Sequence, residues 1–143
     1  MRQIYTILFD LDGTLVDTAP DLMAAHNHVM KKFGHREKEL SDIKLLAGKG
    51  SWVMMQKSFL YDYFDVMLST DDVTNPKPNP EIYETAIQRL GLDATEVLIV
   101  EDNENGIKAA RGSGAHVLVV EHVDDVNYMN LITKIHSIAS EVS

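Results

Sequence analysis

The sequence contains no cysteine and no long hydrophobic run. Without cysteine, disulfide bonds, zinc–thiolate sites and thiol catalysis are excluded, and the absence fits the reducing conditions of the cytoplasm, where we expect the protein. No apolar stretch approaches the roughly 20 residues that a transmembrane helix needs. The N-terminus runs directly into an apolar segment and lacks the layout of a signal peptide, so we expect no association with a membrane.

Positive charge is also scarce. The chain has 13 Lys and Arg residues against 22 Asp and Glu residues, which gives a formal net charge of −9, and no dense basic run occurs. Nucleic-acid-binding proteins use clustered basic residues to neutralise phosphates, so nucleic acid is not expected as a partner. An anionic substrate would need local positive charge, from a metal ion or a placed lysine, to offset the acidic background.

The most informative segment of the chain is an apolar run that ends in two aspartates. Ile4 to Phe9 is typical of a buried strand in a parallel sheet, and Asp10 and Asp12 follow it directly. Two carboxylates so close together are costly to hold unless a cation lies between them. Gly13 then lets the backbone turn sharply. The pattern predicts a metal-assisted site at the carboxyl edge of an α/β sheet.

Apolar runs and helical periodicities alternate along the chain. Runs of the kind that form strands are residues 4–9, 64–69, 97–100 and 116–120. Helices are expected between and after them, with Asn79 and Asn103 as N-caps, Gly91 as a stop and an amphipathic tail from Asp125 onward. This alternation predicts an α/β fold with a parallel sheet of about four strands.

A parallel sheet places the carboxyl ends of all its strands at one edge, and this chain has polar residues there. The expected members of that edge, with a lysine on a loop that leaves it, are Asp10, Asp12, Ser69, Thr70, Glu101, Asp102 and Lys77. Together they supply hard oxygen ligands for Mg²⁺, a nucleophile, an acid/base and a cation. This inventory suits phosphoryl transfer, in which catalysis is mainly positioning and charge neutralisation.

Three motifs in this order resemble those of the haloacid dehalogenase superfamily, within it the phosphoglycolate phosphatase and β-phosphoglucomutase-like group. The first is Asp10-Leu11-Asp12-Gly13-Thr14, the second is Lys77-Pro78-Asn79-Pro80, and the third is Glu101-Asp102-Asn103 followed by Gly106-Ile107-Lys108-Ala109-Ala110. The resemblance implies a three-layer Rossmann-like core with a helical cap. It also implies hydrolysis of a small phosphorylated metabolite.

The resemblance implies roles for the catalytic residues. Asp10 would be the nucleophile that forms an aspartyl-phosphate. Asp12 would protonate the leaving oxygen and then activate water or an acceptor hydroxyl. Lys77 would neutralise charge on the phosphoryl group.

Metal and substrate contacts follow from the same resemblance. Mg²⁺ would be the cofactor, held by Asp10, the backbone carbonyl of Asp12, Asp102 and, as a further ligand, Glu101. The motif-one residues Leu11, Gly13 and Thr14 would contact the phosphoryl group.

The chain departs from the family pattern in its middle. Residues 1 to about 58 resemble the first strand and the first part of the cap, and residues from about 59 onward resemble the later core. The rest of the cap and the strand that ends in the motif-two Ser or Thr are missing, which indicates an internal deletion. Ser69 or Thr70 would replace that hydroxyl only if their strand moved beside the first one. We therefore expect a core of residues 1–16 and 62–143, with residues 17–61 as a remnant of a truncated cap.

Other functions stay open at this point. With the cap mostly absent, the sequence does not distinguish a phosphatase from a phosphosugar mutase. A catalytically weak or inactive remnant that binds metal and phosphate is a second class, and a phospho-accepting receiver module is a third. If the cap is truncated, Trp52 and its apolar neighbours up to Tyr61 form an uncovered patch, and we predict that this patch drives self-association.

Overall fold

The fold is that of a computed structural model of residues 1–143. The structure describes residues 3–11, 13–15 and 64–141, together with residues 24, 27, 28, 31–34, 36, 37 and 39. The expected cap helices and the apolar patch from Trp52 to Tyr61 lie largely or wholly outside the described residues. The division into a core and a cap remnant therefore stays a prediction.

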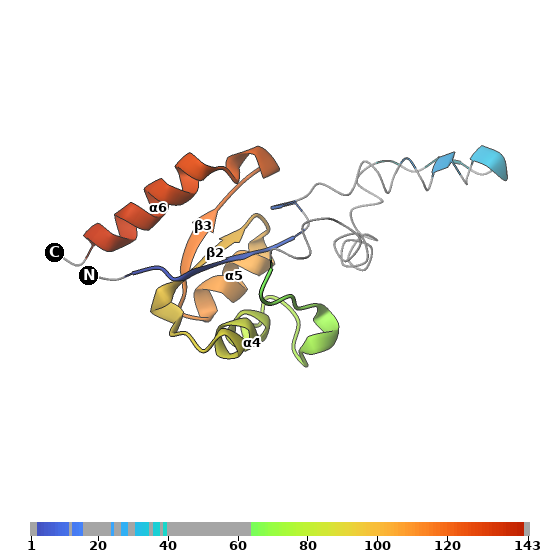
Figure 1. The fold of residues 1–143 in the computed structure, drawn as a ribbon. Coiled ribbons are helices and arrows are strands. Elements are labelled where there is room, and N and C mark those ends of the chain that lie inside the picture. The colour runs from blue at the N-terminus through green and yellow to red at the C-terminus, as the bar shows by residue number, and fades with distance from the viewer. Residues whose placement is uncertain are drawn as a thin grey trace.

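A three-stranded parallel sheet forms the centre of the described part (Figure 1). Its strands are β1 (Thr6–Phe9), β2 (Val97–Glu101) and β3 (His116–Val119), in the spatial order β1-β2-β3. The register pairs Phe9 with Val100 and Glu101 with Val119, so the strands end at a common edge. The predicted parallel α/β fold is confirmed, and the described residues form one strand fewer than expected.

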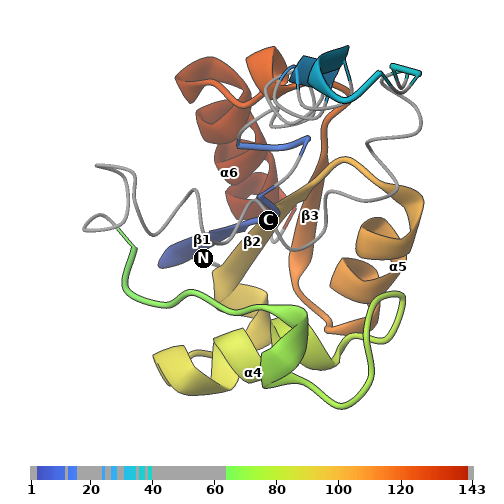
Figure 2. The same cartoon turned by 90° about the vertical axis from the view of Figure 1, so that its right-hand side faces the viewer.

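Helices cover both faces of this sheet (Figures 1 and 2). On one face lie α4 (Glu81–Leu90) and α5 (Glu104–Gly112), and on the other lies α6 (Tyr128–Ser140). The described residues also form short 3₁₀ turns: η3 (Thr70–Asp72), η4 (Ala94–Glu96) and η5 (Val123–Asp125). No helix among the described residues has the length and apolar character that crossing a bilayer requires.

The core sits around β2, which is buried along its whole length. Successive side chains of a strand point to opposite faces of the sheet. Val97 and Ile99 pack in one cluster with residues of α4 and α5. On the opposite face, α6 contributes the fully buried Ile138. The site described below is therefore attached to a strand that is buried along its whole length.

Local sequence signals set the helix ends as expected. The Asn103 side chain accepts a hydrogen bond from the backbone N–H of Gly106, which caps α5. The Asn79 side chain accepts one from the N–H of Glu81, although α4 itself begins one residue later than predicted. Gly91 ends α4 with φ of 67°, a conformation that glycine adopts without strain.

The predicted strand at residues 64–69 is wrong. Residues 64–69 have no regular secondary structure, and the segment passes close to the carboxyl end of β1 (Figures 1 and 2). Its apolar side chains, among them Phe64, Val66 and Leu68, line a cavity of about 170 Å³ together with residues of β1 and α4. The apolar pattern thus reflects burial against that cavity and not membership of the sheet. Within the described ranges, β1 pairs with β2 alone and keeps its other edge unpaired.

Removing the same two methyl groups from neighbouring strands should test this arrangement. Val100 is fully buried, whereas Val119 is 46% exposed. We expect Val100→Ala to lower the free energy of unfolding by about 2–3 kcal/mol, from lost burial and the cavity left behind. Val119→Ala should lower it by less than about 1 kcal/mol. Urea denaturation followed by circular dichroism measures both, and equal losses would contradict the described core.

Candidate active site

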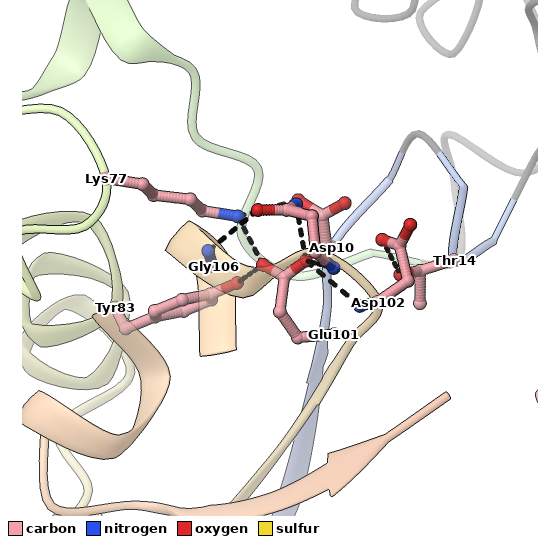
Figure 3. Close-up of polar contacts among 8 residues, drawn as sticks. Asp10, Thr14, Lys77, Tyr83, Glu101, Asp102 and Gly106 are labelled. Carbon is pink, nitrogen blue, oxygen red and sulfur yellow. Dashed lines mark hydrogen bonds and ion pairs between the residues drawn. The ribbon is translucent and has the colours of Figure 1, made fainter. Parts of the chain in front are cut away.

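Carboxylates gather where β1 and β2 end (Figure 3). Asp10 directly follows β1, Glu101 is the last residue of β2, and Asp102 follows it. Each offers a carboxylate oxygen, and these oxygens lie within 4.8 Å of one another. The sheet register brings them together, because Phe9 and Val100 are paired neighbours immediately before them.

Lys77 lies among these carboxylates. Its Nζ is 2.7 Å from Oδ1 of Asp10 and 2.6 Å from Oε2 of Glu101. An ammonium group has three N–H donors, and in the described part of the chain no protein acceptor takes the third. The side chain keeps 22% of its surface exposed, so a ligand at the site has access to that donor.

Glu101 is fully buried, and both of its oxygens accept several hydrogen bonds. Oε2 accepts from Lys77 and, at 2.6 Å, from the phenol of Tyr83. Oε1 accepts from the backbone N–H groups of Asp102 and Asn103 and from the Asn103 side-chain amide. A β-carbon at Gly106 would overlap this carboxylate, so a glycine is needed at this position of α5.

Asp102 is held by the turn that follows β1. The fully buried Thr14 donates its hydroxyl hydrogen to Oδ1 of Asp102 at 2.9 Å. Gly13 has φ of +88°, and a β-carbon there would overlap the Asp102 carboxylate. Both residues thus position Asp102, and no side-chain contact with a substrate is needed to explain why they are a glycine and a threonine.

The electrostatics of the cluster favour a bound cation. Burial raises the pKa of Asp10 from 3.8 to about 6; Lys77 lowers it, and the negative charges of Glu101 and Asp102 add to the rise. Burial also raises the pKa of Asp102, against the hydrogen bond from Thr14. Burial lowers the pKa of Lys77, but attraction to Asp10 and Glu101 outweighs that effect and leaves it raised. Three carboxylates thus face a single ammonium group, and a divalent cation would offset the excess negative charge.

The remaining predicted site residues have different placements. Asp12 lies outside the described residues. Leu11 accepts a backbone hydrogen bond from Leu15 and lines the cavity beside β1. The Ser69 hydroxyl donates to Asp72 and accepts from the N–H of Asp71 within the capping box of η3, and Thr70 is exposed. The structure therefore does not bring the Ser69 or Thr70 hydroxyl into hydrogen-bond contact with Asp10 or Lys77.

Tyr83 belongs to the site and was missed by the sequence reasoning. Helical periodicity assigns it to the apolar stripe of α4, where it indeed packs against Ile87 and Val97. The available signal was its hydroxyl, because a buried tyrosine usually finds a hydrogen-bond partner. Its ring also lies 4.9 Å from Nζ of Lys77, measured to the ring centroid.

A model of the family described as haloacid dehalogenase-like hydrolase matches residues 7–61 and 51–120 of the chain. The chain belongs to this family. Both described segments of the carboxylate cluster, after β1 and after β2, fall within the matched residues.

Two relatives show how this hydrolase aligns with known phosphatases. A phosphoglycolate phosphatase of Nitrosospira multiformis is 25% identical over 190 residues, a match that covers 83% of this chain and 84% of that protein. A phosphorylated carbohydrates phosphatase of Thermotoga maritima is 44% identical over 55 residues, or 38% of this chain and 26% of that protein. In the second match the hydrolase thus spans about a quarter of the relative's length.

Solved structures share the fold. A HAD-superfamily hydrolase of subfamily IA from Geobacter sulfurreducens superposes with a TM-score of 0.65 at 16% identity, covering 86% of this chain and 97% of that chain. A β-phosphoglucomutase of Clostridium difficile gives a TM-score of 0.63 at 17% identity, covering 96% of this chain and 99% of that one.

The alignment lengths bear on the internal deletion. The match to the Nitrosospira protein extends over 190 residues, more than the 143 of the hydrolase, so that relative has residues with no counterpart here. The family model matches in two parts that meet at residues 51–61. An internal deletion relative to the family, near the position expected from the motifs, is consistent with both observations.

The raised pKa of Asp10 leads to a test on the metal-free protein. The pKa of Asp10 is higher in the folded state than in the unfolded state, so the folded state binds its proton more tightly. The free energy of unfolding therefore falls as pH rises from about 4 to about 6, by roughly 3 kcal/mol in total. Asp10→Asn removes this penalty. At pH 7.5 in EDTA, urea denaturation should show the Asp10→Asn variant more stable than wild type by up to that amount, with little gain at pH 3.5. Asp71→Asn, which changes an exposed aspartate, is the control and should leave the free energy of unfolding unaltered. If the Asp10→Asn variant were no more stable than wild type at pH 7.5, the ionised Asp10 carboxylate would not destabilise the folded state.

Proposed function

We propose that this hydrolase is a magnesium-dependent phosphatase that acts on a small phosphorylated metabolite through an aspartyl-phosphate on Asp10. The observation that carries the proposal is the convergence of Asp10, Asp102 and Lys77 at the carboxyl ends of two parallel strands. The family membership and the phosphatases among its relatives support the reaction class.

The donor set fits magnesium. Mg²⁺ prefers carboxylate and carbonyl oxygens and keeps several waters. Asp10 and Asp102 present oxygens that are close together and only partly used by protein donors. The backbone carbonyl of Asp12, outside the described residues, would be the third protein ligand. When bound, the ion neutralises charge on the phosphoryl oxygens and on the two carboxylates.

Asp10, Asp12 and Lys77 each have a distinct role in the proposed reaction. An Asp10 carboxylate oxygen attacks phosphorus as the bond to the leaving oxygen breaks, and Asp12 gives that oxygen its proton. Asp12 next takes a proton from water, whose oxygen attacks the aspartyl-phosphate and releases inorganic phosphate and free Asp10. The third N–H of Lys77 donates to a phosphoryl oxygen throughout and stabilises the charge that develops there.

The substrate we propose is phosphoglycolate or a compound of similar size. This choice rests on the Nitrosospira relative, whose name states that activity. A phosphosugar mutase uses the same aspartyl chemistry and differs in the acceptor, a sugar hydroxyl instead of water. A relative of that kind occurs among the structures of similar fold.

A second candidate is a weakly active or inactive remnant that binds metal and phosphate. It is favoured by the unpaired edge of β1 and by the engagement of the Ser69 hydroxyl in the η3 cap, both within the described ranges. Loss of one oriented donor to developing charge costs on the order of 10²-fold in rate. Metal binding would survive such a loss, because Asp10 and Asp102 sit at the ends of β1 and β2, which are both present.

Phosphate release from para-nitrophenyl phosphate and from phosphoglycolate tests the proposal. With Mg²⁺ we expect release that is abolished by EDTA and by Asp10→Asn, and lowered on the order of 10²-fold or more by Lys77→Met. Asp71→Asn should leave the rate unchanged. Calorimetric Mg²⁺ uptake without turnover of either ester would favour the remnant, and turnover that survives Asp10→Asn would contradict both.

A further inference from the structure

The hydroxyl of Tyr83 is a buried polar group to which the proposed reaction assigns no role. Tyr83 is 5% exposed, comes from the first turn of α4, and points toward the carboxylate cluster (Figure 3). It donates at 2.6 Å to Oε2 of Glu101, the same oxygen that accepts from Lys77. Burial raises the pKa of Tyr83, and the Glu101 carboxylate raises it further, so the phenol stays a donor at neutral pH.

Glu101 is saturated with donors, and this changes its expected role. Both oxygens accept protein hydrogen bonds, and the side chain is fully enclosed. A metal ion would have to displace some of these bonds to gain a direct bond to Glu101. The geometry instead suits a buried anchor whose Oε2 accepts hydrogen bonds from both Lys77 and Tyr83.

Tyr83 acts on Lys77 in two ways. Its ring lies under the ammonium group at 4.9 Å, within the range of a cation–π interaction. Its hydroxyl shares Oε2 with Lys77, and this hydrogen bond withdraws part of the charge that Glu101 would otherwise direct at the lysine. Without the hydroxyl, the fully buried carboxylate would attract Lys77 more strongly and draw it from Asp10.

We propose that Tyr83 is a positioning residue for phosphoryl transfer: through Glu101 it holds the Lys77 ammonium group beside Asp10, with one N–H left for the phosphoryl oxygen. This inference rests on the proposed function for its catalytic consequence. The structural part of the inference, that Tyr83 holds Lys77 in place, rests only on the contacts of Tyr83 with Glu101 and Lys77.

Tyr83→Phe is the central variant, because it removes one oxygen and keeps the ring in the core. Tyr83 does not touch the substrate, so we expect kcat to fall about 10-fold, as for a lost hydrogen bond to a charged group, with KM changed less than about 2-fold. Tyr128→Phe makes the same chemical change at a residue that is 75% exposed and should leave both constants unaltered. An unchanged kcat in Tyr83→Phe would overturn the proposal.

A double-mutant cycle separates positioning from a purely structural role. If Tyr83 acts through Lys77, adding Tyr83→Phe to Lys77→Met should change kcat by less than about 2-fold. If the hydroxyl only stabilises the fold, its loss should cost the same factor in both backgrounds, and the proposal fails. Glu101→Gln keeps the length of the linking side chain and removes its charge. It provides a second variant that should show the same non-additivity with Lys77→Met.

A readout without turnover separates this inference from the proposed function. With ¹⁵N-labelled lysine, the Lys77 ammonium group should give a slowly exchanging NMR signal in metal-free wild type, assigned by its loss in Lys77→Met. Tyr83→Phe should shift or broaden that signal, whereas Tyr128→Phe should not. If wild type releases no phosphate, the proposed function fails while a Tyr83-dependent signal still supports the positioning of Lys77. An identical signal in wild type and Tyr83→Phe would overturn it.

Discussion

One buried carboxylate organises the described part of this hydrolase. Glu101 ends the fully buried strand β2, and an uncompensated carboxylate in that position would cost several kcal/mol. Its donors come from separate parts of the chain: Lys77 from the loop before α4, Tyr83 from α4, and Asn103 from the start of α5. Compensating the charge therefore also fixes where these elements meet at the edge of the sheet. Lys77, whose position is set by Glu101, is thereby also placed beside Asp10.

At this edge of the sheet, two carboxylates lie so close to the backbone of another segment that the residue there must be glycine. Gly106 leaves room for the Glu101 carboxylate at the first turn of α5, where the partial positive charge of a helix N-terminus favours an anion. Gly13 does the same for Asp102 after β1. Both glycines lie in the motifs that resemble the family, so those motifs describe packing around carboxylates as much as chemistry. The residual negative charge of three carboxylates and one lysine is what makes a cation favourable there.

The sequence predicted the elements whose signals are local. The runs that became β1, β2 and β3, the Asn103 cap and the Gly91 stop depend on burial and backbone preferences of a few neighbouring residues. Residues 64–69 carry the same apolar signal but form no strand, because pairing depends on a neighbour that periodicity does not describe. Tyr83 was missed for a related reason: its place in an apolar stripe accounts for its ring and says nothing of its hydroxyl. The convergence of Asp10, Asp102 and Lys77 followed from parallel topology together with the motif order. The partners of Glu101 depend on how the Lys77 loop, α4 and the start of α5 meet, which sequence periodicity does not describe.

An internal deletion relative to the family would affect metal binding and substrate positioning differently. Two ligands of the proposed metal site, Asp10 and Asp102, lie at the ends of β1 and β2, which pair in register. On the other side of β1, the described residues leave the edge unpaired, and the segment containing Val66 and Leu68 lines a cavity. For the proposed phosphoryl transfer, the described residues supply the charge-neutralising Lys77, whereas the Ser69 hydroxyl is engaged in the η3 cap and not in positioning. Since these two contributions act on different atoms of the substrate, we expect charge neutralisation by Lys77 to account for a larger share of whatever catalysis remains.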